Sequence, residues 1–134
     1  MMEKIILYPS AEKIIEYNLL VLKLIKVKKG DTQKVLSKAK ILDTLFDCEE
    51  NTGDVYDKAV CLLKGLIQRH PFASGNRRTA FIVVKDFLMM NHAQFQIKDD
   101  PKYARAMQGI RENFYTDEEI KEWIKNGPIK EFKR

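Results

Sequence analysis

Residues 70–89 read HPFASGNRRTAFIVVKDFLM, and this stretch decides the fold class. Its second half, Ala80 to Met89, is apolar on nearly every side of a helix, which predicts a helix buried at the centre of the protein. Its first half is a polar turn that joins this helix to a preceding one. Gly75 and Asn76 favour turn or left-handed backbone, so successive N–H groups of this turn can point into one concavity.

The sequence on both sides of this stretch is helical in its periodicity, and local signals divide it into about six helices. The signals that open or cap the other helices are Pro9-Ser10, Asp31, Asp54, Asp100-Pro101, and Thr116 with Glu119. In the second helix an apolar stripe of Val35, Ala39, Leu42 and Phe46 is expected to face the core. Residues 95–97 alternate in the manner of a short strand. We therefore expect a compact all-α domain spanning residues 1–134.

The composition bounds the class of protein. The chain has 134 residues with 45% apolar and 32% charged side chains, which is typical of a soluble globular domain rather than a disordered chain. Two cysteines, Cys48 and Cys61, fit neither a disulfide scaffold nor a zinc module. The longest apolar run past the N-terminus, Ala80–Val84, is far short of a membrane span, and the N-terminus has no signal-peptide pattern. We expect a soluble cytoplasmic protein without a membrane partner.

The net charge is a weaker guide to partners. Lys and Arg total 24 against 19 Asp and Glu, which gives a formal net charge of +5. This excess fits a nucleotide, a nucleic acid or an acidic protein equally well. A nucleic-acid-binding helical domain rests on this charge alone, and we rank it last.

The turn itself carries the residues that suggest chemistry. Arg77 and Arg78 fall in the first turn of the buried helix, where cations oppose the helix dipole. A bound anion would resolve this conflict, since arginine binds phosphate oxygens in a bidentate manner. His70 lies directly upstream and is the natural general base, while Phe72 is expected to anchor the turn in the core. The alternative is a capped turn with surface arginines, but the combination favours a phosphate site.

The segment resembles the Fic-domain motif His-Pro-Phe-x-(Asp/Glu)-Gly-Asn-(Gly/Lys)-Arg-x-x-Arg, and the short helical layout resembles the Doc (death-on-curing) branch of the family. The resemblance implies an α-helical bundle with a small β-hairpin flap. The basic turn 26–29 could belong to this flap, but we favour a solvated helix end for it. It also implies transfer from ATP to a hydroxyl of a protein substrate. Fic proteins mostly transfer AMP, whereas Doc toxins phosphorylate a translation elongation factor.

The resemblance also assigns roles by position. His70 would deprotonate the acceptor hydroxyl, Gly75 and Asn76 would bind phosphates, and Arg78 would hold the phosphate chain. Arg77 stands at the position where the Doc branch has lysine. Phe81 replaces the second arginine of AMP-transferring members, which favours phosphoryl transfer.

The main departure from the motif is Ser74, which stands where the family places an acidic Mg²⁺ ligand. A neutral hydroxyl can ligate Mg²⁺ when substrate phosphates supply the remaining charge, yet the metal site should be weakened. ATP and Mg²⁺ are therefore the expected cofactors. The alternative is a catalytically weak or inactive Fic-fold module that binds a nucleotide or a protein.

A family inhibitory helix, Ser/Thr-x-x-x-Glu-(Gly/Asn), is also missing from the sequence. Glu112-Asn113 comes near it, but Gln108 stands where Ser or Thr belongs. We therefore expect inhibition by a separate antitoxin-like partner. The target protein and the oligomeric state are left open.

Overall fold

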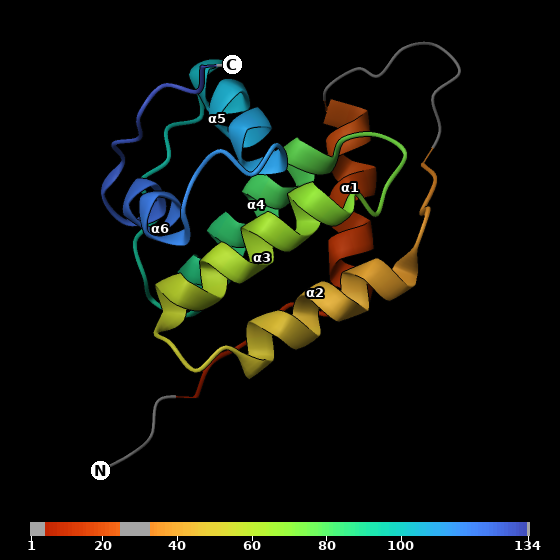
Figure 1. Ribbon diagram of the computed structural model, residues 1–134. Coiled ribbons are helices and arrows are strands. Elements are labelled where there is room, and N and C mark those ends of the chain that lie inside the picture. Colours follow the sequence, from red (N-terminus) through yellow and green to blue (C-terminus); the bar gives the residue numbers. More distant parts are fainter. Residues whose placement is uncertain (1–4, 25–32, 134) are drawn as a thin grey trace.

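The computed structural model describes residues 5–24 and 33–133, and over these residues the chain forms six helices and no strand (Figure 1). The helices are α1 (Ala11–Leu24), α2 (Lys38–Glu50), α3 (Val55–Arg69), α4 (Asn76–Met90), α5 (Lys102–Arg111) and α6 (Asp117–Asn126). The predicted all-α fold class is confirmed. No helix in this part of the chain is long and apolar enough to cross a membrane.

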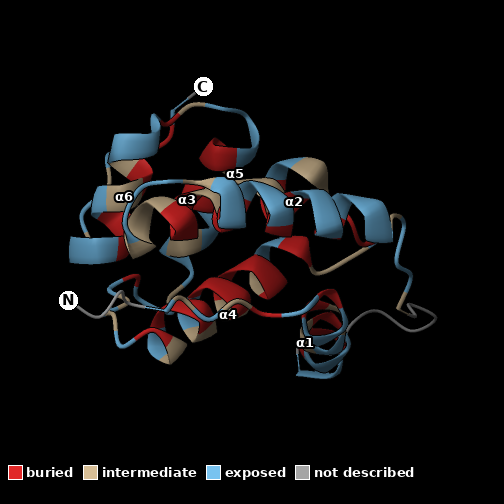
Figure 2. Cartoon of the chain, turned by 90° about the horizontal axis from the view of Figure 1, so that it is seen from below, coloured by how far each residue is buried: buried red, intermediate tan, exposed pale blue. Residues whose placement is uncertain are grey.

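The centre of the bundle is formed by α3 and α4. Helix α3 contacts α2, α4, α5 and α6, while α1 packs against α4 and α2 (Figure 1). Most of α4 is buried, as expected for a helix that is apolar nearly all round, and Val83, Phe87 and Leu88 have no exposed surface (Figure 2). Met89 was also expected in the core but is 61% exposed, because it lies one turn along the helix from Lys85 and shares the solvent-facing side of α4 with it.

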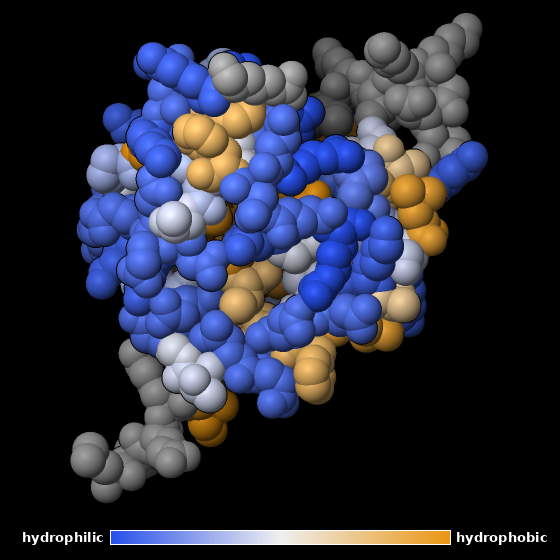
Figure 3. Space-filling model, viewed as in Figure 1, coloured by the Kyte–Doolittle hydropathy of each residue, from blue (hydrophilic) through white to orange (hydrophobic). Residues whose placement is uncertain are grey.

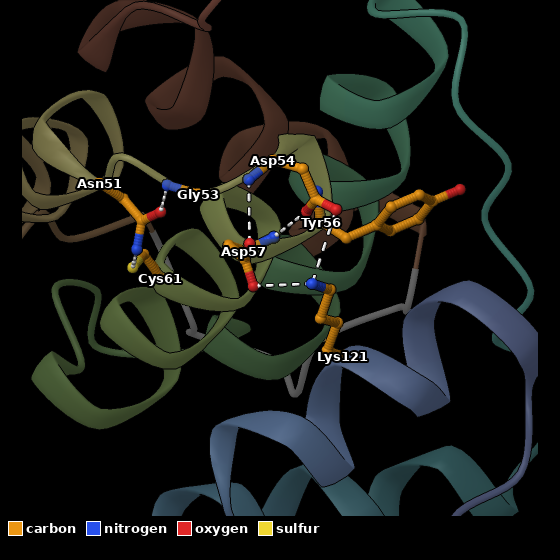
Figure 4. Close-up of polar contacts among 7 residues, drawn as sticks. All are labelled: Asn51, Gly53, Asp54, Tyr56, Asp57, Cys61 and Lys121. Atoms are coloured by element: carbon orange, nitrogen blue, oxygen red, sulfur yellow. Dashed lines mark hydrogen bonds and ion pairs between the residues drawn. The ribbon is translucent and has the colours of Figure 1, made fainter.

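Two helices begin at the residues that strong capping signals in the sequence predict. The Asp54 carboxylate accepts from the N–H groups of Tyr56 and Asp57, and Asp57 accepts from the N–H of Asp54 in return. Lys121 of α6 forms ion pairs with both carboxylates at 3.5 and 3.0 Å (Figure 4). The capping box that begins α3 thus also ties α6 to it. The capping box of Thr116 begins α6 as predicted.

The predicted start of the second helix is wrong over the part that the structure describes. Val35 does not lie in a helix but forms an antiparallel β-bridge with Phe72. The N–H of Leu36 donates to the carbonyl of Pro71 at 2.8 Å, and these contacts hold the chain extended until Ser37 caps α2. The predicted cap, Asp31, lies outside the described residues.

The predicted core face of α2 is also wrong. Leu42 and Phe46 are 50% and 61% exposed, whereas Ile41, Leu45 and Cys48 are buried. Both sets have helical spacing and are offset by one residue, or about 100° around the axis, so periodicity alone does not choose between them. Val35 and Ala39, the other two residues of the stripe predicted to face the core, are exposed as well. Hydrophobic side chains gather at the edge of the molecule where the segment before α2 lies (Figure 3).

The strand predicted at residues 95–97 does not form. The N–H of Gln96 donates to the carbonyl of Ile124 at 2.9 Å, so this segment runs beside the end of α6 instead of pairing with a strand. Its neighbour Ile97 is buried, and Phe95 packs edge-on against Phe81. The basic turn 26–29, interpreted as a solvated helix end or a part of the flap, lies outside the described residues.

Candidate functional site

The turn between α3 and α4 departs from ordinary backbone geometry at both ends. His70 ends α3 with φ 53° and ψ 61°, in the left-handed region that non-glycine residues avoid. Gly75 precedes α4 with φ 78°, and a Cβ there would lie 3.2 Å from Nδ2 of Asn18. Glycine is therefore favoured at position 75, and the non-glycine His70 holds a conformation that costs about 1–2 kcal/mol. Such strain is common at functional sites.

Two buried amides hold the turn in place. Oδ1 of Asn76 accepts from the N–H of Phe72 at 3.0 Å, and Nδ2 of Asn76 donates to the carbonyl of Phe72 at 2.8 Å. Asn18 of α1 donates to the carbonyl of Ser74 at 2.9 Å and to the hydroxyl of Thr79 at 3.1 Å. Phe72 is buried in the core, as its alternation with His70 predicts. In this structure the Asn76 side chain therefore shapes the turn.

A cavity of about 410 Å³ opens at the N-terminus of α4. It brings together all six residues expected to form the site, which are His70, Ser74, Gly75, Asn76, Arg77 and Arg78. Tyr103, Ala104 and Arg111 of α5 and Ile67 of α3 complete the lining. The first N–H groups of a helix have no acceptor within it, so this end of α4 offers donors and partial positive charge to an anion.

The ring of His70 faces a hydrogen-bond donor at each nitrogen. Nδ2 of Asn76 lies 3.3 Å from Nε2, and Nη1 of Arg111 lies 3.3 Å from Nδ1. Burial lowers the pKa of His70, and the nearby charges of Arg111, Lys40 and Arg77 lower it further. His70 is thus kept in the neutral form that a general base requires.

Arg78 is paired within the chain. Its guanidinium binds both carboxylate oxygens of Asp99, at 2.5 and 3.0 Å, and contacts the hydroxyl of Tyr103 at 3.0 Å. It also lies 5.1 Å above the ring centre of Phe81. The hydrogen bond to Arg78 holds the pKa of Asp99 below its ordinary value. The sequence suggested that a bound anion would offset the unfavourable position of the two arginines at the positive end of the helix dipole. At Arg78 the carboxylate of Asp99 does this instead, while Arg77 stays exposed.

The residues around the cavity do not form an Mg²⁺ site by themselves. Ser74 lines the cavity as a half-buried neutral hydroxyl, and none of the lining residues carries a carboxylate. Among the described residues no group of three His, Cys, Asp or Glu side chains could hold a metal ion. Mg²⁺ prefers anionic oxygen ligands, so this donor set does not fit a cation held by the protein alone.

Three neighbours of the site were missed by sequence reasoning. Tyr103 stacks on Phe81 with ring centres 4.7 Å apart, and its aromatic character near the start of the fifth helix is the one sequence signal that could have placed it there. Asp99 and Arg111 have no local signal. They reach Arg78 and His70 only because α5 and the segment before it pack beside α3 and α4.

Comparison with known proteins agrees with this geometry. The sequence model of the Fic/DOC family matches residues 25–88, which include the whole turn and nearly all of α4. The match confirms the predicted family: the matched part of the chain is of the Fic/DOC family, and this indicates a Fic-type transferase. No curated protein matches the chain. The finer assignment to the Doc branch stays a prediction.

Proposed function

We propose that this protein transfers a phosphoryl group from ATP to a hydroxyl of a protein substrate, in the manner of Doc toxins. One observation carries the proposal: the neutral, strained His70 opens on the same cavity as the N-terminus of α4 and its two arginines. A base and an anion site at such close quarters are what transfer between a phosphate and a hydroxyl requires. The Fic/DOC match over this segment supports the same chemistry.

The proposed reaction assigns a task to each part of the cavity. The N–H groups that begin α4, together with Arg77 and Arg78, bind the phosphate oxygens and favour the charge that develops on them. His70 takes the proton of the acceptor hydroxyl. The hydroxyl oxygen then bonds to the terminal phosphorus, the bond from this phosphorus to the bridging oxygen breaks, and ADP leaves. The proton on His70 is returned to solvent.

AMP transfer uses the same residues with a different phosphate at the reacting position. The oxygen would then attack the α-phosphorus and pyrophosphate would leave. We favour phosphoryl transfer because Phe81 stands where AMP-transferring members have a second arginine, and its ring packs beneath Arg78. Any Mg²⁺ in this proposal would arrive with ATP and be held mainly by phosphate oxygens, with the Ser74 hydroxyl as the neutral contribution of the protein.

Labelled ATP tests the proposal. The protein is incubated with a cell lysate and with either α- or γ-labelled ATP, in the presence of Mg²⁺ or Mn²⁺. Label on a protein from the γ position alone identifies a kinase, and label from the α position identifies AMP transfer. The His70→Ala variant should abolish labelling, and His92→Ala is the matched control, because His92 is the other histidine and also has a positive φ of 57°. Absence of labelling from both positions, with no effect of His70→Ala, would contradict the proposal.

A second candidate is a catalytically weak or inactive module that binds a nucleotide or a protein. The cavity favours it in two respects: Ser74 offers no charge to a metal, and Arg78 is already paired with Asp99. The Ser74→Asp variant separates the candidates. A gain of transfer activity from nothing would show an intact scaffold that lacks only its metal ligand.

The partners also belong to the proposal. A translation factor is the proposed target, and mass spectrometry of the labelled protein identifies it. A separate antitoxin-like inhibitor is the proposed source of restraint. The neighbouring genes are the place to look for it, and suppression of labelling by the encoded protein would support its role.

A further inference from the structure

Arg111 is a cation of the cavity that lies outside the family motif. It is the last residue of α5, its side chain is exposed, and it lines the same cavity as His70. Its Nη1 lies 3.3 Å from Nδ1 of His70. A guanidinium and an amide nitrogen can only donate hydrogen bonds, and Nδ2 of Asn76 faces Nε2 at the same 3.3 Å, so only one of the two contacts can be a hydrogen bond to the neutral ring at a time.

This contact has a consequence for His70 as a base. A neutral imidazole has one nitrogen lone pair that can accept, and in the tautomer with the proton on Nε2 the contact with Arg111 occupies it. The other ring nitrogen faces Nδ2 of Asn76, whose amide is buried and fixed in orientation by its two bonds to Phe72. An acceptor hydroxyl can reach a lone pair of His70 only by displacing a donor, and the exposed Arg111 is the donor that can move.

An anion in the cavity is what would draw Arg111 away. Bonds between a guanidinium and phosphate oxygens are charge-assisted on both sides and are stronger than a bond to a neutral imidazole. Arg78 already binds both oxygens of Asp99. For Arg111, the structure gives no carboxylate within ion-pair distance among the residues it describes. Arg111 is therefore the more available of the two to an incoming phosphate.

We propose that Arg111 is a positioning residue that couples phosphate binding to release of the base: it donates to Nδ1 of His70 in the empty cavity and turns to the phosphate oxygens of ATP when the nucleotide binds. The Nδ1 lone pair then receives the proton of the acceptor hydroxyl while its oxygen bonds to phosphorus and ADP departs. The inference rests on the proposed function, because it takes His70 as the base and a nucleotide phosphate as the anion. It adds which nitrogen reacts and what keeps it occupied before ATP binds.

Nitrogen-15 NMR of the His70 ring tests this coupling without needing turnover. The probe is the non-hydrolysable analogue β,γ-imido-ATP, added to the whole chain and to the Arg111→Met variant, which keeps an unbranched, flexible side chain and removes every donor. Lys102→Met is the matched control, since Lys102 lies on the same helix and does not line this cavity. Arg111→Lys tests whether a shorter donor restores part of the effect.

The expected result has two parts. The nitrogen-15 chemical shift of His70 Nδ1 in Arg111→Met without nucleotide should equal the shift that the unmodified protein shows when the analogue is bound. Arg111→Met should also weaken binding of the analogue about tenfold or more, as the loss of a charge-assisted bond implies, with partial recovery in Arg111→Lys. Lys102→Met should leave both the signal and the affinity within about twofold of the unmodified protein.

The outcomes separate this inference from the proposed function. An unchanged Nδ1 signal in Arg111→Met, or equal affinity for the analogue, overturns the role of Arg111 even if the protein transfers label. A further outcome is that labelling fails in every condition while the Nδ1 shift of Arg111→Met without nucleotide equals that of the unmodified protein with the analogue. In that case the proposed transfer is wrong and the coupling between Arg111 and His70 stands.

Discussion

Replacing Asp99 with asparagine should tighten the binding of ATP. In the structure the Asp99 carboxylate occupies the bidentate face of Arg78 that a phosphate would use. The nucleotide must therefore break this ion pair or bind beside a negative charge. Asparagine keeps the size of the side chain and removes the charge, while Tyr103 and the ring of Phe81 still hold the guanidinium in place.

The size of the effect follows from the exposure of the pair. The side chains of Arg78 and Asp99 are 29% and 54% exposed, so solvent screens much of their attraction. Exposed ion pairs of this kind contribute about 0.2–1 kcal/mol. Removing such a competitor lowers the dissociation constant for ATP by up to about fivefold. The same variant should lose no more than about 1 kcal/mol of unfolding free energy.

Isothermal titration calorimetry with β,γ-imido-ATP measures the affinity, and urea denaturation measures the stability. The chain offers a close control in Asp47→Asn, because Asp47 pairs with Arg69 with side-chain exposures of 49% and 34% and lies outside the cavity. Asp47→Asn should lose similar stability without any change of affinity. Weaker binding in Asp99→Asn would refute the reasoning and show that Asp99 aligns Arg78 for the phosphate. An unchanged affinity would show that Arg78 does not contact the nucleotide.

Three further predictions concern the turn and its base. Ser74→Asp should increase Mg²⁺-dependent binding of ATP and labelling of protein, because it adds an anionic oxygen at the metal-ligand position; equal binding with and without Mg²⁺ would count against this. Gly75→Ala should cost about 1–2 kcal/mol in urea denaturation, because φ there is 78° and the new Cβ would press on Asn18; a neutral effect would contradict the observed turn. The rate of transfer should be full above the lowered pKa of His70 and should fall as pH drops through it, so the acid limb of a kcat/KM profile should lie below the ordinary value of 6.5. A limb above that value would show that the burial and the cations around His70 do not govern the rate.

Strong local signals were sufficient for much of the fold. The side chains of Asp54 and Thr116 accept hydrogen bonds from backbone N–H groups two or three residues away, so their capping roles can be recognised from the local sequence. The burial of α4 follows from its composition alone. The position of the turn that forms the cavity could likewise be read from its glycine, its asparagine and its two arginines.

Features set by distant contacts could not be predicted in this way. Val35 was expected in a helix, but a bridge to Phe72, far along the chain, keeps it extended. The buried face of α2 depends on how the helix is rotated against α3, and Leu42 and Ile41 are equally apolar candidates for it. Asp99 enters the site through the packing of its segment beside α4, which no short pattern records.

The proposed chemistry depends on the cavity at the start of α4 being a phosphate site with His70 at its edge. The most direct test is an amide NMR titration of the protein with ATP and, separately, with adenosine, which lacks the phosphates. A phosphate site at this place should give large shifts for the N–H groups of residues 75–78 and for His70 with ATP, and small shifts there with adenosine. Shifts of equal size with both ligands, or shifts with ATP that lie elsewhere on the protein, would contradict it.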